Sequence, residues 1–441
     1  MPNWKLSRYT VIFRTESGDA IFHNSFMGAL ALVPSTDFAK IESRLNREIF
    51  SHDLQNNTLH ELCQNLFFFP TGIDEKNYVT DILHKENKSG HFDIIILPHE
   101  NCNFRCVYCY ETHRRGRMEP AVVEGLKRFV EKKAAECKSL SIRWFGGEPL
   151  LAADIIDDLS SSFLASCAKS GVSYHSHMTT NAYLLTPTVF EQLIKNRIKD
   201  FQITLDGPEA CHDTTRILAG GGKTFQTIYN NLLQMQQSDH DFSVSLRINF
   251  NDESIPLMED FFASLSKTFG NDRRFGLYLR PIGKYGGPND ENIAVCEPDI
   301  AKVIEMDLSE KYLPYGYLDK LIKKSLQSHG QVCYAAKESS IVVGSDGTVY
   351  KCSVSFEDAN NHVGKLLPDG KLEIDPLRWN LWVSNSYDKN HICDSCPVYP
   401  LCQGKYCPRS SIREQKPVCP MTRTTYSQLI QLAASSMAKF Q

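Results

Sequence analysis

The sequence predicts an α/β protein built around a parallel sheet or barrel, with a small α+β module before it and a cysteine-rich region after it. Three observations predict this order. Strand-like and helical segments alternate from residue 92 to residue 280, a mixed strand and helix pattern precedes them, and seven of the 15 cysteines lie beyond residue 330.

The first 90 residues are predicted to form a winged-helix-like module of three strands and three helices. Its expected strands are Tyr9–Phe13, Ala20–Phe22 and Gly28–Val33. Its expected helices are Asp37–Phe50, Thr58–Leu66 and Asp74–Lys88. The polar stretch Glu86–Gly90 is the expected linker to the next region.

Residues 91–295 are predicted to alternate strands with helices, which is typical of βα units in a parallel sheet. The expected strands are Phe92–Leu97, Leu140–Phe145, Tyr174–Thr180, Phe201–Leu205, Ser243–Phe250 and Phe275–Arg280. The expected helices are Pro120–Cys137, Ala152–Lys169, Pro187–Lys195, Phe225–Gln237 and Pro256–Phe269. Such folds carry their chemistry at the C-terminal ends of the strands. Functional residues are therefore expected there.

Residues 296–330 are predicted to be a helical bridge to the last region, 331–441. That region reads as short hairpins, loops and cysteines, followed by a helix over Thr424–Met437.

Composition excludes several classes of function. The 441 residues carry 48 Lys+Arg against 52 Asp+Glu, a formal charge of −4 with mixed signs, so neither nucleic acid nor a membrane surface is an expected partner. No apolar run approaches the roughly 20 residues of a membrane helix, and no secretion signal is visible. These features predict a cytoplasmic protein, in which clustered cysteines are metal ligands or catalytic groups more often than disulfides.

Three cysteines, Cys102, Cys106 and Cys109, follow the first expected barrel strand with the spacing CxxxCxxC. A structural zinc site uses four ligands, so an incomplete zinc knuckle is one interpretation. The other is a [4Fe–4S] cluster on three thiolates, which leaves one iron open to an outside ligand.

These residues resemble the hallmark of the radical SAM superfamily, in which an aromatic residue, here Tyr108, precedes the last cysteine. The resemblance implies a partial (βα)6 barrel that binds S-adenosylmethionine (SAM) on the open iron. It further implies that the residues in contact with SAM lie at successive strand ends, in motifs similar to GGEP, TN and S-x-D-G…R: Gly146, Gly147, Glu148, Asn181, Thr204, Asp206 and Arg216. Thr204 stands where the family usually has serine, and Ala182 where a glycine is common.

The family's chemistry follows from the same resemblance. An electron from an external donor such as flavodoxin or ferredoxin reaches the cluster, SAM is cleaved, and a 5′-deoxyadenosyl radical abstracts a substrate hydrogen.

The C-terminal cysteines resemble the SPASM extension, which holds two auxiliary [4Fe–4S] clusters and brings the implied total to three. By that resemblance the outer cluster takes Cys393, Cys396, Cys402 and Cys419, and the inner one takes Cys333, Cys352 and Cys407. The inner cluster lacks a fourth cysteine nearby, so an open iron, Cys296 or a non-cysteine ligand remain alternatives. Spacing alone also permits a pair of zinc sites completed by His362 or His391.

The N-terminal module resembles the recognition element that binds the leader of a ribosomally made precursor peptide as an added strand. A capping domain packed on the barrel is the alternative interpretation.

Together these resemblances imply an oxidoreductase that abstracts hydrogen from a residue of a precursor peptide and installs a side-chain crosslink (thioether, C–C or ether), that is, a peptide maturase and cyclase. The runner-up is the anaerobic sulfatase-maturating type, although Ser353 follows Cys352 where those enzymes typically carry Asp. A zinc-binding peptide adaptor without turnover is the alternative outside enzymes. No catalytic base is assigned.

Overall fold

The structure is a computed structural model that describes residues 3–87, 90–297, 300–301, 303–305, 307, 322 and 324–438. The chain forms two compact units. Unit 1 consists of Met1–Ser89, Asp319–Lys337 and Ser384–Gln441, and unit 2 of Gly90–Leu318 and Glu338–Val383. The cysteine-rich region predicted over 331–441 is thus shared between the units, and most of the helical bridge predicted over 296–330 lies outside the described residues.

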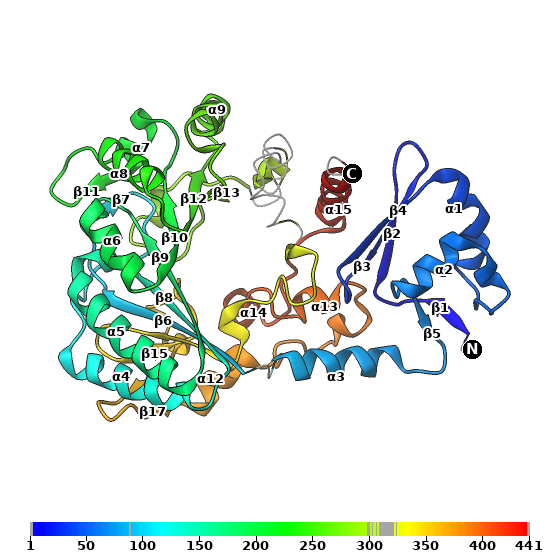
Figure 1. The fold of residues 1–441 in the computed structure, drawn as a ribbon, viewed down its shortest axis with the longest axis horizontal. Coiled ribbons are helices and arrows are strands. Elements are labelled where there is room, and N and C mark those ends of the chain that lie inside the picture. Colours follow the sequence, from blue (N-terminus) through cyan, green and yellow to red (C-terminus); the bar gives the residue numbers. More distant parts are fainter. Residues whose placement is uncertain are drawn as a thin grey trace. The chain divides into compact units, whose positions relative to one another are not determined.

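Unit 2 is built on a ten-stranded sheet (Figure 1). Six of its strands are neighbours in chain order and run parallel, as the sequence predicts. They are β6 (His91–His99), β8 (Ser139–Gly146), β9 (Ser173–Thr180), β10 (Ile198–Thr204), β12 (Ser243–Phe250) and β13 (Phe275–Pro281). The predicted βα alternation is therefore confirmed in this unit.

The helices of unit 2 cover one face of this sheet (Figure 1). The longer ones among the described residues are α4 (Pro120–Ala134), α5 (Ala153–Ser170), α6 (Pro187–Lys195), α8 (Phe225–Gln237) and α9 (Met258–Phe269). On β8 the residues buried against them alternate, Leu140, Ile142 and Trp144, whereas the intervening positions, such as Arg143, are half-buried and polar. The inner face of the sheet is therefore left to polar side chains, which positions the site.

Short elements missed by the sequence patterns also lie in unit 2. The strands β7 (Phe104–Cys106) and β11 (Arg216–Leu218) pair antiparallel, and α7 (Glu209–Thr215) precedes the second of them. Each is too short for periodicity to identify.

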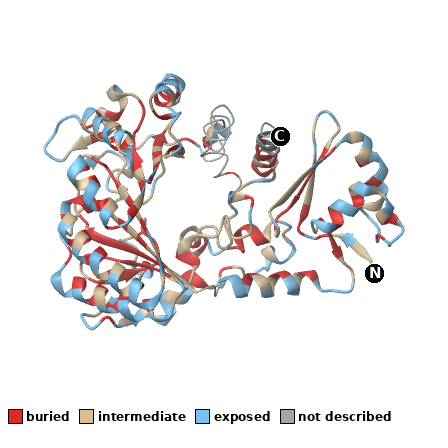
Figure 2. Cartoon of the chain, in the orientation of Figure 1, coloured by how far each residue is buried: buried red, intermediate tan, exposed pale blue. Residues whose placement is uncertain are grey.

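The sheet continues into the cysteine-rich region. Strand β14 (Ser340–Val343) pairs parallel with β6, and β15 (Thr348–Tyr350), β16 (His362–Leu366) and β17 (Leu372–Ile374) follow antiparallel, with α12 (Pro376–Val383) after them. The short hairpins expected in this region are present, and they extend the sheet of the barrel. Figure 2 shows how deeply the strands of this sheet are buried.

Unit 1 contains the three-stranded sheet of β2 (Thr10–Arg14), β3 (Ala20–Asn24) and β4 (Ala29–Val33), and the pair of β1 (Trp4–Leu6) with β5 (Phe68–Pro70). Its helices are α1 (Ser35–Ile41), α2 (Asn57–Gln64), α3 (Glu75–Asn87), α13 (Tyr399–Cys402), α14 (Pro408–Glu414) and α15 (Arg423–Ala438).

The helix predicted over Asp37–Phe50 was too long. It ends at Ile41, followed by a single 3-10 turn, because Ile49 exchanges two backbone hydrogen bonds with Trp4 at 2.9 and 2.7 Å. This pairing with the N-terminal strand outweighs the helical periodicity of the segment.

Among the described residues, no helix combines the length and apolar character that crossing a bilayer requires.

Candidate active site

A pocket in unit 2 opens where the sheet strands end. Its walls come from the loop after β6 and from the ends of β8, β9, β10, β12 and β13. The predicted site residues that line it are Cys102, Cys106, Tyr108, Cys109, Gly146, Gly147, Asn181, Thr204 and Arg216. Residues separated by more than 100 positions in the sequence thus share one cavity.

The loop after β6 that carries Cys102, Cys106 and Cys109 is here called the cluster loop. Its three thiols lie in one electrostatic environment. The pKa of Cys102 is raised to about 12, mainly by burial, and the Glu148 carboxylate and the thiols of Cys106 and Cys109 act in the same direction. Burial likewise raises the pKa of Cys109 to about 12, and that of Cys106. Metal binding would therefore have to displace protons from all three.

The donor set fits a four-iron cluster with one open iron, since three thiols and no fourth cysteine line the pocket. Within the described residues, no three His, Cys, Asp or Glu side chains are placed around a single metal ion. A four-iron cluster binds each thiolate through a different iron and does not need them around one point.

The two glycines after β8 let the strand approach the cluster loop. Gly146 has a φ of +116°, which L side chains rarely adopt. A Cβ on Gly147 would lie 2.5 Å from the carbonyl oxygen of Asn101, in the residue before Cys102. A side chain at Gly147 would therefore displace the start of the cysteine loop, whereas one at Gly146 would meet the carbonyl oxygen of His99 at the end of β6, at 2.5 Å.

Two predicted site residues, Glu148 and Asp206, lie behind the pocket wall and are not among its lining residues. Glu148 is fully buried and accepts hydrogen bonds from the Thr180 hydroxyl at 2.7 Å and the Asn181 amide at 2.8 Å. Burial raises the pKa of Glu148 despite these donors. In this structure the carboxylate therefore stabilises the end of β9 through these hydrogen bonds.

Arg216 carries an orphaned polar atom beside the pocket. Its Nη1 donates to the Tyr108 hydroxyl at 3.0 Å, but its buried Nε has no hydrogen-bond partner. Buried donors without a partner are costly, so a ligand acceptor is expected here. The carboxylate of SAM supplies such an acceptor, and the arrangement fits that cofactor.

Sequence reasoning missed several pocket residues: Tyr110, Glu111, Arg247 and Asn249. Burial raises the pKa of Glu111 to about 8. Arg247 and Asn249 occupy alternate positions near the end of β12, so strand periodicity was the signal that would have identified them. Tyr285, which the sequence places in a glycine-rich loop, also lines the pocket.

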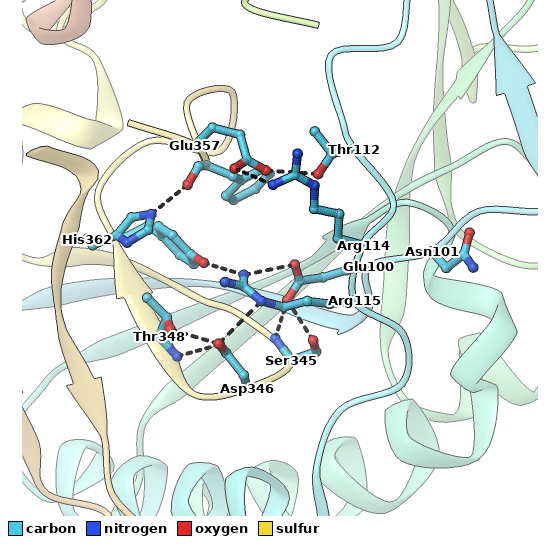
Figure 3. Close-up of polar contacts among 12 residues, drawn as sticks. Glu100, Asn101, Thr112, Arg114, Arg115, Ser345, Asp346, Thr348, Glu357 and His362 are labelled. Carbon is cyan, nitrogen blue, oxygen red and sulfur yellow. Dashed lines mark hydrogen bonds and ion pairs between the residues drawn. The ribbon is translucent and has the colours of Figure 1, made fainter. Parts of the chain in front are cut away.

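A polar network joins the cluster loop to the hairpin that precedes Cys352 (Figure 3). Glu100 accepts hydrogen bonds from the amide and hydroxyl of Ser345 at 2.7 and 2.6 Å. Arg115 contacts Glu100 and Asp346, each at 3.3 Å, and donates to the Tyr350 hydroxyl at 2.6 Å. The loop of the first three cysteines is thereby fixed to the sheet extension that leads into Cys352.

Four of the C-terminal cysteines influence one another within unit 1. The thiol of Cys402 lies close enough to Cys396 and Cys419 for both to raise its pKa, to about 11, although burial is the larger cause. Cys396 and Cys402 act in the same direction on Cys393. These are the four predicted ligands of the outer cluster. Of the predicted inner ligands, Cys333 and Cys407 belong to unit 1 and Cys352 to unit 2.

Residues 96–261 match the family model of the radical SAM superfamily. GTP 3′,8-cyclase of Clostridium botulinum is 27% identical over 281 residues, 60% of this chain and 82% of that protein. The radical SAM cyclopropyl synthase TigE of Paramaledivibacter caminithermalis is 21% identical over 90% of this chain and 88% of its own. A serine-type anaerobic sulfatase-maturating enzyme of Klebsiella aerogenes is 21% identical over 71% and 79% of the two chains.

Two solved structures show the same fold. Native anSMEcpe with bound AdoMet and the Cp18Cys peptide has a TM-score of 0.59 at 18% identity, and the match covers 79% of this chain and 98% of that one. Streptococcus suis SuiB bound to precursor peptide SuiA has a TM-score of 0.53 at 16% identity and covers 94% and 98%.

The fold and the pocket therefore define a radical SAM domain, a class that uses SAM and a [4Fe–4S] cluster. Residues 96–261 of this chain match that domain, and the curated relatives that share it are enzymes.

Proposed function

We propose that this radical SAM enzyme abstracts hydrogen from a ribosomally made precursor peptide and installs an intrapeptide side-chain crosslink, whether thioether, C–C or ether. The observation that carries the proposal is the single pocket in which three thiols, two close-approach glycines and the unpaired edge of Arg216 meet. The similarity to SuiB, which was crystallised with a precursor peptide, spans 94% of this chain and supports a peptide substrate.

The residues of the pocket would have two roles, binding of the first cluster and binding of SAM. Cys102, Cys106 and Cys109 would hold the first cluster, while the other residues would bind SAM through backbone and polar groups: Tyr108, Gly146, Gly147, Asn181, Thr204 and Arg216, with Glu148 and Asp206 behind them. When bound, the reduced cluster and SAM supply the 5′-deoxyadenosyl radical that removes a hydrogen atom from the substrate.

The C-terminal cysteines would hold two auxiliary clusters. Mutual influence among the thiols of Cys393, Cys396, Cys402 and Cys419 supports the outer one. By the family resemblance, Cys333, Cys352 and Cys407 would hold the inner one, whose fourth position is open or taken by Cys296 or a non-cysteine ligand. Electrons would come from an external donor such as flavodoxin or ferredoxin, and the N-terminal module would bind the precursor's leader peptide in a cytoplasmic enzyme.

Formylglycine formation is the second candidate function, favoured by the sulfatase-maturating relative. Ser353 after Cys352 departs from the Asp of that type and speaks against it. The two products can be distinguished chemically. Formylglycine is an aldehyde and reacts with hydroxylamine, whereas a thioether, C–C or ether crosslink does not.

The test begins with metal content. Anaerobically prepared protein should contain about twelve iron and twelve sulfide for three four-iron clusters. Replacing Cys102, Cys106 and Cys109 together with Ala should remove about four of each and abolish 5′-deoxyadenosine formation. Cys137→Ala is the matched control, since that thiol lies outside the pocket. Zinc without iron would favour the adaptor interpretation.

Co-expression with the small open reading frames beside the gene, followed by mass spectrometry, then tests the product. A loss of two hydrogens per modification without reaction towards hydroxylamine is expected. An aldehyde product would instead establish the formylglycine alternative.

A further inference from the structure

The hydroxyl of Tyr108 is the centre of a buried hydrogen-bond junction. It donates to the carboxylate of Asp206. It accepts from Nη1 of Arg216 at 3.0 Å and from Nδ2 of Asn249 at 3.1 Å. A phenol hydroxyl has one hydrogen and two lone pairs, so its hydrogen-bonding capacity is fully used.

This hydroxyl links two opposite charges that do not touch. Asp206 is 2% exposed and Arg216 is 7% exposed. Among the ion pairs of the part of the chain that the structure describes, none joins these two side chains. The positive charge of Arg216 is thus held near the buried carboxylate through the oxygen of Tyr108.

The junction also fixes which edge of Arg216 remains available. Its guanidinium lies over the ring of Phe104, 5.6 Å from the centroid, and its Nη1 is taken by Tyr108. The buried Nε has no partner. A guanidinium edge with free N–H groups is suited to a carboxylate, which accepts two parallel hydrogen bonds.

We propose that the Tyr108 hydroxyl is a positioning group that holds the free edge of Arg216 toward the carboxylate of bound SAM. The inference rests on the SAM site of the proposed function and adds a requirement to it. Any aromatic residue satisfies the cysteine motif, but in this chain the position requires tyrosine.

The requirement follows from what phenylalanine would leave behind. The ring would still fill its place, but Asp206 would lose a donor, and Arg216 and Asn249 would each lose an acceptor. Unpaired buried polar groups are costly, so these side chains would rearrange. Asn249 still contacts Asp206 at 3.0 Å, which limits the change to the Arg216 side of the junction.

The test is the affinity for SAM, measured by isothermal titration calorimetry on anaerobically reconstituted protein. Tyr108→Phe should retain its iron and bind SAM about tenfold more weakly, the consequence of one misdirected charge-assisted hydrogen bond. Tyr229→Phe is the matched control, because it also loses a partly buried hydroxyl hydrogen bond, between Tyr229 on α8 and Thr268 on α9 at 2.9 Å, and neither residue lines the pocket.

Two further measurements separate positioning from a general loss of structure. In an Arg216→Met background, Tyr108→Phe should have almost no additional effect on SAM affinity. Decarboxylated SAM should bind wild type and Tyr108→Phe with equal affinity. Additive losses in the first measurement, or an equal tenfold loss in the second, would overturn the proposal.

If Tyr108→Phe loses iron, Asn249→Leu provides the second variant. Asn249→Leu keeps the Tyr108 hydroxyl but removes the Asn249 amide that donates a hydrogen bond to it. The SAM affinity of this variant should be about threefold weaker. Unchanged affinity in either iron-containing variant would overturn the proposal. Wild-type protein that holds iron and binds no SAM would instead reject the proposed function itself.

Discussion

Gly147→Ala should disable SAM binding through the backbone rather than through a lost side-chain contact. The added Cβ would meet the carbonyl oxygen of Asn101 at 2.5 Å and that of Glu100 at 2.8 Å. Cβ atoms in proteins essentially never approach below 3.0 Å, so the oxygen of Asn101 must move by at least about 0.5 Å, and by about 0.9 Å to reach ordinary contact. That oxygen belongs to the residue before Cys102, so the cluster loop moves with it.

A displacement of about 1 Å in a reacting group costs about a hundredfold in rate, and overpacking costs about 1–3 kcal/mol of stability. We therefore expect Gly147→Ala to remain folded, to bind SAM at least tenfold more weakly, and to form 5′-deoxyadenosine about a hundredfold more slowly. The assays are calorimetry with SAM and chromatography of 5′-deoxyadenosine under dithionite.

Gly116→Ala is the matched control. It makes the same substitution beyond the same loop, where a Cβ meets nothing within 4 Å. Its SAM affinity should equal that of wild type. Wild-type affinity and turnover in Gly147→Ala would refute the reasoning, because they would mean that the loop absorbs the clash without moving the cluster.

Two further predictions concern stability. Arg115→Met should lower the free energy of unfolding by about 2 kcal/mol, because the nearly buried Glu100 loses the positive charge beside it and keeps only its hydrogen bonds from Ser345. Arg114→Met should lower it by less than about 0.5 kcal/mol, because the ion-pair partner of Arg114 is more than half exposed. Equal urea midpoints for the Arg115→Met and Arg114→Met variants would contradict this prediction. Burial lowers the pKa of His23 to about 4, below its unfolded value of about 6.5. The unfolded chain therefore binds this proton first, so the contribution of His23 to the free energy of unfolding is fully present above pH 6.5 and is lost as the pH falls toward 4. The loss should reach about 3 kcal/mol, and His23→Asn should flatten that part of the urea-midpoint profile; an unchanged profile would assign it to other groups.

The barrel was predictable because its segments are long and periodic. On β8 the apolar residues alternate, and on α5 they recur at helical spacing, so burial of one face determines the element locally. The predicted residues that line the pocket all come from sequence motifs, such as the cysteine motif and Gly146–Gly147. Short pairings such as β1 with β5 carry no such signal.

Other features depended on groups that are distant in the chain. Glu148 was expected to contact SAM. In the structure its carboxylate accepts hydrogen bonds from Thr180 and from Asn181, the latter 33 residues away in the sequence. The sequence also offers no reason to connect Tyr108 with Asn249, 141 residues later.

By itself, then, the sequence determined the order of strands and helices, the three thiols of the cluster loop and the class of chemistry they imply, because each is encoded within a few neighbouring residues. Only the tertiary structure decided which polar groups satisfy one another and which are left unpaired at the pocket, such as Nε of Arg216. The physical reason is that a buried polar group must find a partner in space, and the sheet determines which strand ends are close enough to provide one.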